Sequence, residues 1–486
     1  MAKRIQIEGI AVSPDHYING QRISSPDTFE DRSPLNWSNQ LARISRGNLD
    51  TANLAVEAAN KAFPLWASKT ASERAAYMNR LADIIDTNIS TIAKIECIDM
   101  AMLEESLRKR VIPRAAENFR LYAELASTYE ERQWTSKGTN NRVARMPAGP
   151  ALVITPWNAP FMLSSWKCSP ALAAGNTVIL KPAEWSPLTA SLLADFIEEA
   201  NFPPGVFNIV QGIGEEIGAL LTDNPSIRRI SFTGSTDTAI SIGTSAAKNI
   251  VPFTAELGGK SPLIVFDDAD IISAANKAAG QYDDSGQVCM AGTRLLVDQK
   301  IKEPFLEAFH AQTDKHVLGD SRQSGTTISP VIHPDHLSRI SGFIDRARSA
   351  GDKIIRGGKR WTNDGLWYEP TLIEPKSNSS EVVQNEIFGP VLTLQTFSSE
   401  AEAIRLANST PYGLAAIVYT GSKDRAILVA NALSAGTIWT NCFLIRDLTA
   451  PFGGTGISGI GREGGDYALD FHSDLKTIQI LEDSVQ

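Results

Sequence analysis

The first quarter of the chain carries the spacing of amphipathic helices. Between residues 50 and 130, the segments DTANLAVEAANKAFPLWA and SERAAYMNRLADIIDTNISTIAKIECIDM place apolar residues three and four positions apart. This spacing is typical of helices with one buried face. Asp50 and Ser72 are the predicted N-caps, because each short polar side chain stands at the start of an apolar pattern. We expect this region to be a helical scaffold.

From residue 150 the pattern changes to that of an α/β domain. The short apolar runs ALVITPW, NTVILKP, GVFNIVQG, RRISFTGS and SPLIVFD alternate with helix-like segments such as SPLTASLLADFIEEA. This alternation predicts a parallel sheet with crossover helices. Several runs end in the polar or glycine-rich turns PWN, KPAE, QGIG and FTGST. We expect a ligand there, because open α/β sheets bind ligands at the carboxyl ends of their strands.

A second α/β region is predicted from about 260 to 440, through TRLLVDQK, DKIIRGG, PVLTLQTF, LAAIVYT and GTIWTN. We place the domain boundary at ELGGK, Glu256 to Lys260, where the two patterns meet. Residues 129–148 and the tail from about 470 are alternating and polar, and are predicted to be exposed ribbon strands. Unpaired strand edges usually find a partner chain, so the ribbon is expected to contact another chain.

Composition narrows the class of protein. The 486 residues, 43% hydrophobic and 21% charged, are those of a globular protein of two or three domains. A net charge of −9 argues against general binding to nucleic acid or to an anionic membrane. No apolar run approaches the roughly 20 residues of a membrane span, and no signal peptide is expected at the start. Four scattered cysteines without a C-x-x-C pair predict neither disulfides nor a metal site, and fit a reducing cytoplasm.

Three residues could together carry chemistry. Cys289, in SGQVCMAGTR, has no histidine near it in sequence. Alone it could be a buried structural thiol, Glu256 a surface acid and Asn158 the cap of a turn. Together they supply a nucleophile, a base to activate water and a donor to an oxyanion. With a nicotinamide cofactor as the hydride acceptor, this set would oxidise an aldehyde through a thioester, and no histidine is needed.

Nine stretches give this chemistry a family. In order they are ITPWNAP, LAAGNTVILKPAEWSP, PPGVFNIVQG, ISFTGST, ELGGKSPLIVFDDADI, GQVCMAGTR, EIFGPVL, NSTPYGLAA and PFGGTGISGIGREGG. The sequence resembles the NAD(P)-dependent aldehyde dehydrogenase family over nearly its whole length. The resemblance implies the aldehyde dehydrogenase fold: a Rossmann-like NAD-binding domain, an α/β catalytic domain and a small β-ribbon oligomerisation arm. It places them at residues 1–128 with 149–257, at 258–440, and at 129–148 with 470–486, while 441–469 return to the NAD-binding domain and line the substrate pocket.

The resemblance also assigns roles. Cys289 matches the catalytic thiol, Glu256 the general base and Asn158 the oxyanion residue. The positions matching cofactor contacts are Thr155, Trp157, Lys181, Glu184, Gly214, Gly234, Ser235, Leu257, His336, Glu386 and Phe388. Among them Lys181 and Glu184 match the residues that hold the adenosine ribose, Gly234 and Ser235 the pyrophosphate contact, and Glu386 and Phe388 the contacts to the nicotinamide ribose and ring.

Two features bear on the choice of cofactor. FTGST is predicted to end a strand and open a helix, so its free N–H groups can face a phosphate. Glu184 can accept both ribose hydroxyls and would repel a 2′-phosphate, which predicts NAD over NADP, although Lys181 weakens that preference. Ala239, His336 and Gly456 stand where the family more often has glycine, glutamine and lysine; they affect the fine affinity for the cofactor, not the reaction.

Two further stretches narrow the substrate. VIPRAAENFRLYAELA and FLIRDLTAPFGG resemble the branch that oxidises 2-hydroxymuconate, 2-aminomuconate and carboxymethyl-hydroxymuconate semialdehydes. The carboxylate-binding arginines of that branch match Arg114 and Arg446, and a planar guanidinium grips a carboxylate with two hydrogen bonds. The alternative is that both arginines pair with structural acids, Asp447 first among them. For the aromatic residues Phe161, Trp166 and Phe443, a place in the pocket and a place in the core are equally open.

Other functions stay open at this point. The substrate could be a ring-cleavage product of an aromatic or N-heteroaromatic compound, as the open semialdehyde or its hydroxylactone, or instead a benzaldehyde- or salicylaldehyde-type compound. A CoA-acylating dehydrogenase is disfavoured, because such enzymes in the family often lack the base at Glu256. A non-catalytic structural or binding protein is disfavoured by the intact catalytic set.

Overall fold

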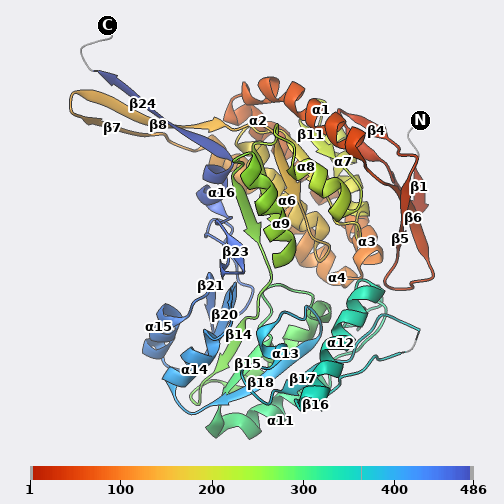
Figure 1. Cartoon of the computed structure of the whole chain (residues 1–486), viewed down its shortest axis with the longest axis vertical. Coiled ribbons are helices and arrows are strands. Elements are labelled where there is room, and N and C mark those ends of the chain that lie inside the picture. The colour runs from red at the N-terminus through yellow and green to blue at the C-terminus, as the bar shows by residue number, and fades with distance from the viewer. Residues whose placement is uncertain (1–3, 363, 482–486) are drawn as a thin grey trace.

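Two β-sheets organise the chain into two lobes (Figure 1). The structure, a computed structural model, describes residues 4–362 and 364–481. In the first sheet the strands lie in the order β23-β13-β12-β9-β10-β11-β3-β4. Their bounds are β3 (His16–Ile18), β4 (Gln21–Ile23), β9 (Ala151–Ile154), β10 (Val178–Lys181), β11 (Phe207–Ile209), β12 (Arg229–Thr233), β13 (Phe253–Glu256) and β23 (Gly459–Ile460). β9 to β13 run parallel, and the parallel arrangement of β9 to β12 was predicted.

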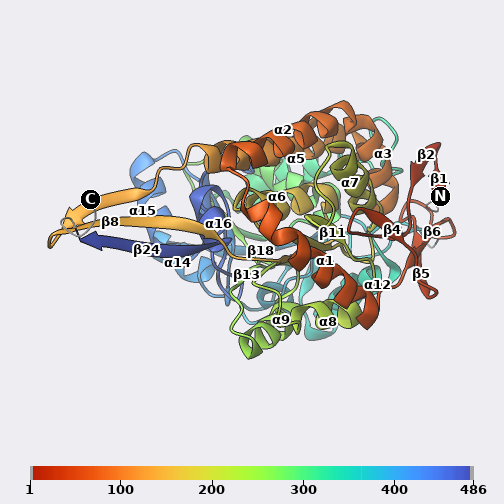
Figure 2. The same ribbon diagram turned by 90° about the horizontal axis from the view of Figure 1, so that it is seen from above.

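Helices cover both faces of the first sheet (Figures 1 and 2). They are α1 (Leu49–Ala67), α2 (Ala71–Thr87), α3 (Ile89–Met100), α4 (Glu104–Ser106), the π-helix η1 (Leu107–Val111), α5 (Ile112–Ser127), α6 (Pro160–Ala173), α7 (Leu188–Glu199), the π-helix η2 (Gly214–Gly218), α8 (Ala219–Thr222), α9 (Thr236–Lys248) and α16 (Gly465–Phe471). The predicted helical scaffold between residues 50 and 130 is confirmed.

The predicted N-caps were wrong by two residues at each helix. α1 is capped by Asn48, whose side chain accepts a hydrogen bond from the Thr51 N–H at 3.1 Å. α2 is capped by Thr70, which forms a reciprocal capping box with Glu73. The capping residue must lie before the first helical turn, where backbone N–H groups lack partners. Asp50 and Ser72 lie inside that turn.

The second sheet has the order β16-β17-β18-β15-β14-β20-β21. Its strands are β14 (Pro262–Val265), β15 (Arg294–Asp298), β16 (Lys353–Arg356), β17 (Thr371–Glu374), β18 (Val391–Phe397), β20 (Ala415–Tyr419) and β21 (Thr437–Thr440). The helices of this lobe are α10 (Ile271–Ala279), the 3₁₀ segments η3 (Gly280–Gly286) and η4 (Gln299–Ile301), α11 (Lys302–Thr313), α12 (Pro334–Ala350), α13 (Glu381–Gln384), α14 (Glu400–Ala407) and α15 (Lys423–Ala432).

Two strands depart from the sequence prediction. The pattern of the run SPLIVFD groups it with the strands of the first sheet, although it follows the predicted boundary at ELGGK; it forms β14, which pairs with β15 and β20 in the second sheet. The fifth parallel strand of the first sheet is instead β13, which was not predicted. β14 has the same apolar pattern as a first-sheet strand because both of its faces are buried. Leu263 and Val265 join one hydrophobic cluster and Ile264 joins another on the opposite face.

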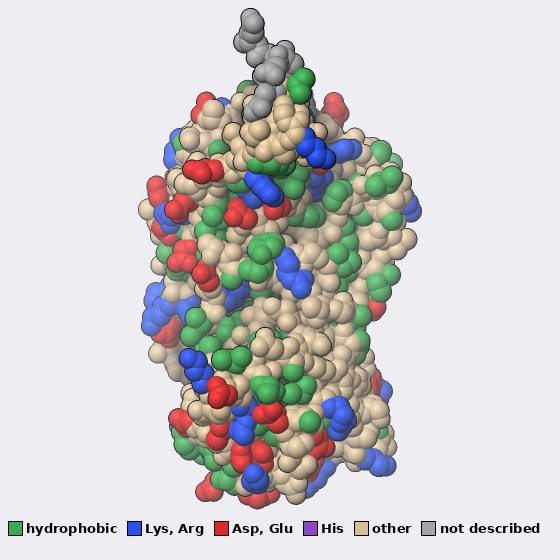
Figure 3. Space-filling model, turned by 90° about the vertical axis from the view of Figure 1, so that its left-hand side faces the viewer, with side chains coloured by type: hydrophobic (Ala, Val, Ile, Leu, Met, Phe, Trp, Pro, Cys, Tyr) green, Lys and Arg blue, Asp and Glu red, His purple; other side chains and the backbone are tan. Residues whose placement is uncertain are grey.

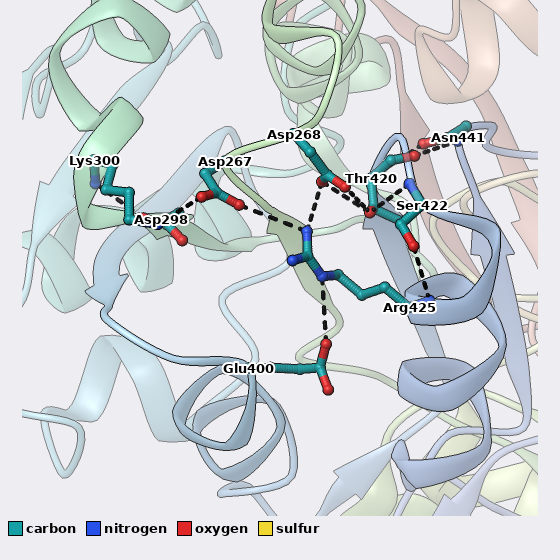
Figure 4. A network of polar contacts seen from close by, with 9 residues as sticks. All are labelled: Asp267, Asp268, Asp298, Lys300, Glu400, Thr420, Ser422, Arg425 and Asn441. Atoms are coloured by element: carbon teal, nitrogen blue, oxygen red, sulfur yellow. Dashed lines mark hydrogen bonds and ion pairs between the residues drawn. The ribbon is translucent and has the colours of Figure 1, made fainter.

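A polar network fastens the carboxyl ends of β14 and β20 (Figure 4). The guanidinium of Arg425 on α15 lies 2.7 Å from Asp268 and 3.3 Å from Glu400, and Thr420 donates to Asp268 at 2.9 Å. Asp268 follows β14, and Glu400 begins α14. The network therefore ties two strand ends to two helices, at the end of the sheet away from Cys289, which precedes β15.

A three-stranded ribbon projects from the first lobe (Figures 1 and 2). It contains β7 (Arg132–Ser136), β8 (Thr139–Pro147) and β24 (Ser473–Leu481), in the order β24-β8-β7. The predicted ribbon strands are confirmed within the described residues, and positions 482–486 of the predicted arm lie outside them. Seen from the side of the arm, hydrophobic side chains are scattered among charged ones (Figure 3), and Trp134, Leu475 and Ile480 of the ribbon are exposed.

The remaining strands form small two-stranded sheets. These pair β1 (Ile5–Ile7) with β2 (Ile10–Val12), β5 (Thr28–Arg32) with β6 (Gln40–Ser45), and β19 (Tyr412–Gly413) with β22 (Thr455–Gly456). Among the described residues, every helix is too short or too polar to cross a membrane.

Candidate active site

The site lies where four neighbouring strands of the first sheet end. β13, β12, β9 and β10 are adjacent and parallel, so their carboxyl ends lie at one edge. Glu256 is the last residue of β13 and Lys181 the last of β10. Thr155, Trp157 and Asn158 follow β9 directly, and Gly234 with Ser235 follow β12. The structure thus brings together residues that lie about 100 positions apart in the sequence.

Cys289 reaches this edge on a strained loop of the second lobe. Asp284, Ser285 and Gly286 have positive φ angles of 52°, 55° and 65° in succession. A non-glycine residue in this conformation costs about 1–3 kcal/mol, so the surrounding contacts must hold it. The Ser285 hydroxyl donates to the Ser329 carbonyl, and the Gln287 side chain accepts from the Ile332 N–H at 3.0 Å. The loop therefore presents a partly exposed Cys289 in a fixed place.

The surroundings of Cys289 hold its thiol protonated. Burial raises the pKa of the thiol to about 12, with help from the nearby carboxyls of Glu386 and Glu256, while Arg446 acts in the opposite direction. The thiolate is the reactive form of a cysteine, so Cys289 would need a proton acceptor close by to act as a nucleophile.

Asn158 is oriented by the same loop. Its side-chain amide donates to the Gln287 carbonyl at 3.0 Å, two residues before Cys289. An amide NH₂ carries two N–H donors, so this bond fixes the group and leaves one donor for another acceptor. Asn158 and the thiol loop thus meet across the two lobes.

Glu256 is buried without a hydrogen-bond partner. The residue is 5% exposed, and neither carboxyl oxygen is hydrogen-bonded. Burial raises its pKa well above the usual range, and Glu463 adds to the effect, while Lys167 and the nearby arginines oppose it. A side chain at Gly453 would come within 2.7 Å of one carboxyl oxygen, so glycine there makes room for the acid. Glu256 is poised to take up a proton.

Sequence reasoning missed a buried ion pair beside this acid. Glu463 accepts hydrogen bonds from the Trp166 indole at 2.6 Å and from the ammonium of Lys167. Lys167 also donates to the Ser231 hydroxyl and to the Phe232 carbonyl. A signal was present, because Lys167 is the one charged residue in the otherwise apolar or small segment FMLSSWKCSPALA, and a buried charge needs a partner.

One end of the edge is built to receive hydroxyl groups. Burial would raise the pKa of Glu184, but the ammonium of Lys181, 2.8 Å away, and N–H donors that include Gly214 hold it below its usual value. A side chain at Gly214 would lie within 3.8 Å of both charged groups, so glycine keeps this end open. An ionised carboxylate accepts two ribose hydroxyls well and repels a phosphate.

The next strand end offers backbone donors. Ser235 caps α9, its side chain accepting from the Thr238 N–H at 3.2 Å. Gly234 has no room for a side chain, since a Cβ would lie 2.4 Å from the Phe232 ring. The first N–H groups of α9 suit a phosphate. Thr155 and Leu257 are nearly buried at the ends of β9 and β13, Leu257 donating to the Ser458 carbonyl.

An aromatic cluster closes the site between the lobes. The Trp157 ring lies 5.3 Å from Phe388 and 5.4 Å from His336, edge to face in both cases. His336 also bonds the Phe388 carbonyl at 2.7 Å, and burial lowers its pKa to about 4. His336 is therefore neutral near pH 7. Glu386 lies two residues before Phe388 and accepts from the Gly259 N–H at 3.0 Å.

Two arginines of this region lack an ion pair with any of the described residues. Among the described residues, neither Arg114 nor Arg446 forms a salt bridge, and one Arg114 nitrogen is buried without a hydrogen bond. Arg446 lies over the rings of Phe452, at 3.9 Å, and Trp166, at 5.3 Å. Burial and then the charge of Arg114 lower the pKa of Arg446 to about 10. Asp447, the alternative partner, instead accepts from Thr449 at 2.8 Å.

The three predicted pocket aromatics lie in different places. Phe161 is fully buried and packs against Phe196, so its ring belongs to the core of the first lobe. Trp166 lies between Glu463 and Arg446. Phe443 lies on the loop that carries Arg446. It is partly buried and packs edge to face against Trp439. The structure therefore places Trp166 against Arg446, packs Phe443 against Trp439 and buries Phe161 in the core.

Known proteins share the sequence pattern and the fold of this chain. The model of the aldehyde dehydrogenase family matches residues 22–478. The chain belongs to the aldehyde dehydrogenase family. The predicted family and fold are thereby confirmed. A solved structure of the AldA indole-3-acetaldehyde dehydrogenase of P. syringae, a mutant in complex with NAD⁺ and IAA, superposes on this aldehyde dehydrogenase with a TM-score of 0.95 at 34% identity, covering 98% of each chain.

Relatives in sequence include two semialdehyde dehydrogenases. The 2-hydroxymuconic semialdehyde dehydrogenase of Pseudomonas sp. (strain CF600) is 37% identical over 478 residues, which cover 95% of this aldehyde dehydrogenase and 98% of the relative. The human 2-aminomuconic semialdehyde dehydrogenase is 36% identical over 478 residues, covering 96% and 98%. General aldehyde dehydrogenases match equally well, such as that of Emericella nidulans at 39% over 468 residues, with 95% and 94% covered.

Proposed function

We propose that this aldehyde dehydrogenase uses NAD to oxidise an unsaturated semialdehyde that bears a carboxylate, in its open or hydroxylactone form, to the corresponding acid. The observation that carries the proposal is the pair Arg114 and Arg446, which forms no salt bridge among the described residues and whose member Arg446 lies within electrostatic reach of the Cys289 thiol. Burying two like charges without an acid is unfavourable. A substrate carboxylate would supply the missing charge and place the aldehyde end toward the thiol.

The first half of the reaction uses the thiol and the amide. Cys289 gives up its proton to Glu256, directly or through water, and its sulfur attacks the aldehyde carbon. The free N–H of Asn158 and the backbone N–H of Cys289 hold the resulting oxyanion. The bound NAD supplies the hydride acceptor, and the loss of hydride leaves a thioester on Cys289.

The second half uses the buried acid. Glu256 first releases to solvent the proton that it took from Cys289. It then takes a proton from water, which attacks the thioester carbonyl, and returns this proton to the departing sulfur, so that the acid leaves and the Cys289 thiol re-forms. Glu463, paired with Lys167, raises the pKa of Glu256 and so makes it a stronger proton acceptor. Among carboxyls at this edge, Glu256 is the one with both oxygens free of hydrogen bonds.

The residues present fit NAD. Lys181, Glu184 and Gly214 would hold the adenosine ribose, and the first turn of α9 at Gly234 and Ser235 the pyrophosphate. Glu386 would accept hydroxyls of the nicotinamide ribose, with Phe388 beside the ring. The ionised Glu184 favours NAD over NADP. The NAD⁺ complex of the P. syringae relative supports this proposal.

The other functions are weaker on the same observations. A benzaldehyde-type substrate would leave the two guanidiniums unpaired. A CoA-acylating enzyme has no use for the buried base Glu256, and a structural protein has none for the strained thiol loop. We further propose that the NAD-binding domain comprises 1–128 with 149–257, the catalytic domain 258–440 and the arm 129–148 with 470–486. The ribbon would join chains into a homodimer or homotetramer. The protein would work in a reducing cytoplasm.

The test compares two aldehydes and one substitution. NADH formation is measured with 2-hydroxymuconate semialdehyde and with benzaldehyde, in the wild type and in Arg446→Met, which keeps the contact with Phe452. A charge-assisted hydrogen bond contributes about 1.5–3 kcal/mol, so kcat/KM for the semialdehyde should fall roughly 10- to 100-fold, and that for benzaldehyde less than about threefold.

The control is Arg405→Met, at an exposed arginine of α14, which should change neither value. A wild type that prefers benzaldehyde, with no effect of Arg446→Met on the ratio of the two substrates, would refute the carboxylate clamp and leave the thiol chemistry standing.

A further inference from the structure

One short segment links the two sheets and touches both halves of the site. Glu256 ends β13 of the first sheet, Pro262 begins β14 of the second, and Gly258, Gly259 and Lys260 lie between. A side chain at Gly259 would come within 2.9 Å of the Cys289 carbonyl. The segment therefore lies directly against the thiol loop.

The carboxylate of Glu386 rests on this segment. One oxygen accepts from the Gly259 N–H at 3.0 Å, and the other occupies space that a side chain at Gly258 would need, 1.9 Å from its Cβ position. Arg339 approaches from α12 and donates to the Glu386 and Ile387 carbonyls. Glu386 is thus held by the segment on one side and by an arginine on the other.

Lys260 is a buried ammonium with no hydrogen-bond partner among the residues that the structure describes. The residue is 1% exposed, and its Nζ is unpaired. Arg294 donates to the backbone carbonyl of Lys260 at 2.7 Å, and its other N–H groups donate to the Leu406 and Ala407 carbonyls. A buried charge without a partner destabilises the folded protein, so we expect a lysine at this position to serve a function.

The space around Lys260 rules out one such function. The cavity that it lines with Tyr412 and Ser434 has a volume of about 10 Å³, which is at most one water molecule. No aldehyde fits there, so Lys260 cannot form an imine with a substrate. What remains within electrostatic reach of its charge is Glu386, with Arg294 as the opposing like charge.

We propose that Lys260 is a positioning residue for the nicotinamide half of NAD. From the segment whose Gly259 N–H binds Glu386, its buried, unpaired ammonium stabilises the Glu386 carboxylate as the acceptor for the hydroxyls of the nicotinamide ribose. This inference rests on the proposed function of Glu386 as a ribose contact. Lys260 itself touches neither the substrate nor the cofactor.

The titration of the two groups supports this role. Burial raises the pKa of Glu386 to about 7, while the Gly259 N–H, Arg339 and Lys260 act to lower it. Burial and the charge of Arg294 lower the pKa of Lys260 to about 7, and Glu386 opposes that shift. Tyr412 and Cys289 are the other titratable groups facing Glu386. A carboxyl with this pKa binds ribose above pH 7 and loses the acceptor as the pH falls.

Lys260→Met tests the inference, because methionine has a similar shape and no charge. The Kd for NAD is measured by calorimetry from pH 6 to 9. Without Lys260 the pKa of Glu386 rises, so the acid-side midpoint of binding should move up by about one pH unit, and NAD should bind roughly tenfold more weakly between pH 6 and 7. Above pH 8 Lys260 is neutral in the wild type, and the two proteins should converge.

Three further variants sharpen the test. Lys260→Arg keeps the charge and should keep the wild-type midpoint. Glu386→Gln should flatten the pH dependence, and adding Lys260→Met to it should then have no effect. Equal weakening by Lys260→Met at every pH, or the same shift in the Glu386→Gln background, would overturn the inference and make Lys260 merely structural. Failure of the wild type to bind NAD at any pH would overturn the proposed function and this inference with it.

Discussion

Cys289→Ala is expected to abolish NADH formation with every aldehyde. The variant lacks the sulfur that would bond to the aldehyde carbon, and no other residue near the edge can replace it. Loss of a covalent nucleophile typically lowers kcat by a factor on the order of 10⁴ or more. The fold should be unaffected, because the strain of the thiol loop is held by Ser285 and Gln287 and not by the thiol.

The matched control is Cys97→Ala, which removes a thiol buried in α3 and should leave kcat within about twofold of the wild type. Both variants are assayed for NADH formation and for NAD affinity. Cys289→Ala should still bind NAD, which separates a lost nucleophile from a damaged site. Retention of a tenth of the wild-type rate by Cys289→Ala would refute the thioester mechanism.

Glu256→Gln is expected to stop the reaction at the thioester. Glutamine has the same shape as the acid but cannot take a proton from water. We expect a burst of about one NADH per active site, followed by turnover slowed roughly 10²- to 10⁴-fold, as for the loss of a general base. The burst requires that Cys289 can still lose its proton to water, so it should be slow near neutral pH and faster at high pH.

The intermediate gives a direct measurement. Mass spectrometry of the quenched Glu256→Gln protein should show the acyl group on the peptide that contains Cys289. Glu198→Gln, at an exposed position of α7, serves as the control and should show neither a burst nor an adduct. Full steady-state turnover by Glu256→Gln would mean that another group activates the water, Glu463 being the nearest candidate.

The sequence predicted the place of a site residue where the end of a short apolar run was enough to locate it. Lys181 and the FTGST turn end their strands as predicted, because short buried strands followed by polar turns are visible without the fold. The pair Lys167–Glu463 was not visible, since its members lie 296 residues apart and only the packing of α6 brings them together. In the same way, only the folded structure shows that Arg114 lacks an ion-pair partner among the described residues.

Local patterns also failed in recognisable ways. The β14 strand is buried on both faces, so its composition does not say which sheet it joins. The N-caps were misplaced because several polar residues crowd each helix start and only the backbone direction selects among them. Phe161, expected near the substrate or in the core, went to the core because α6 turns it toward Phe196.

The order in which the chain is synthesised leaves one edge of the ribbon arm unpaired for a time. Its middle strand, β8, ends at Pro147, but its partner strand β24 begins only at Ser473. During synthesis at roughly 5–20 residues per second, the edge of β8 waits on the order of 20–70 s for that partner. A nascent or prematurely terminated chain therefore exposes an open strand edge, which is prone to pair with other chains. The strand that covers this edge, β24, is thus made long after the strand that it protects.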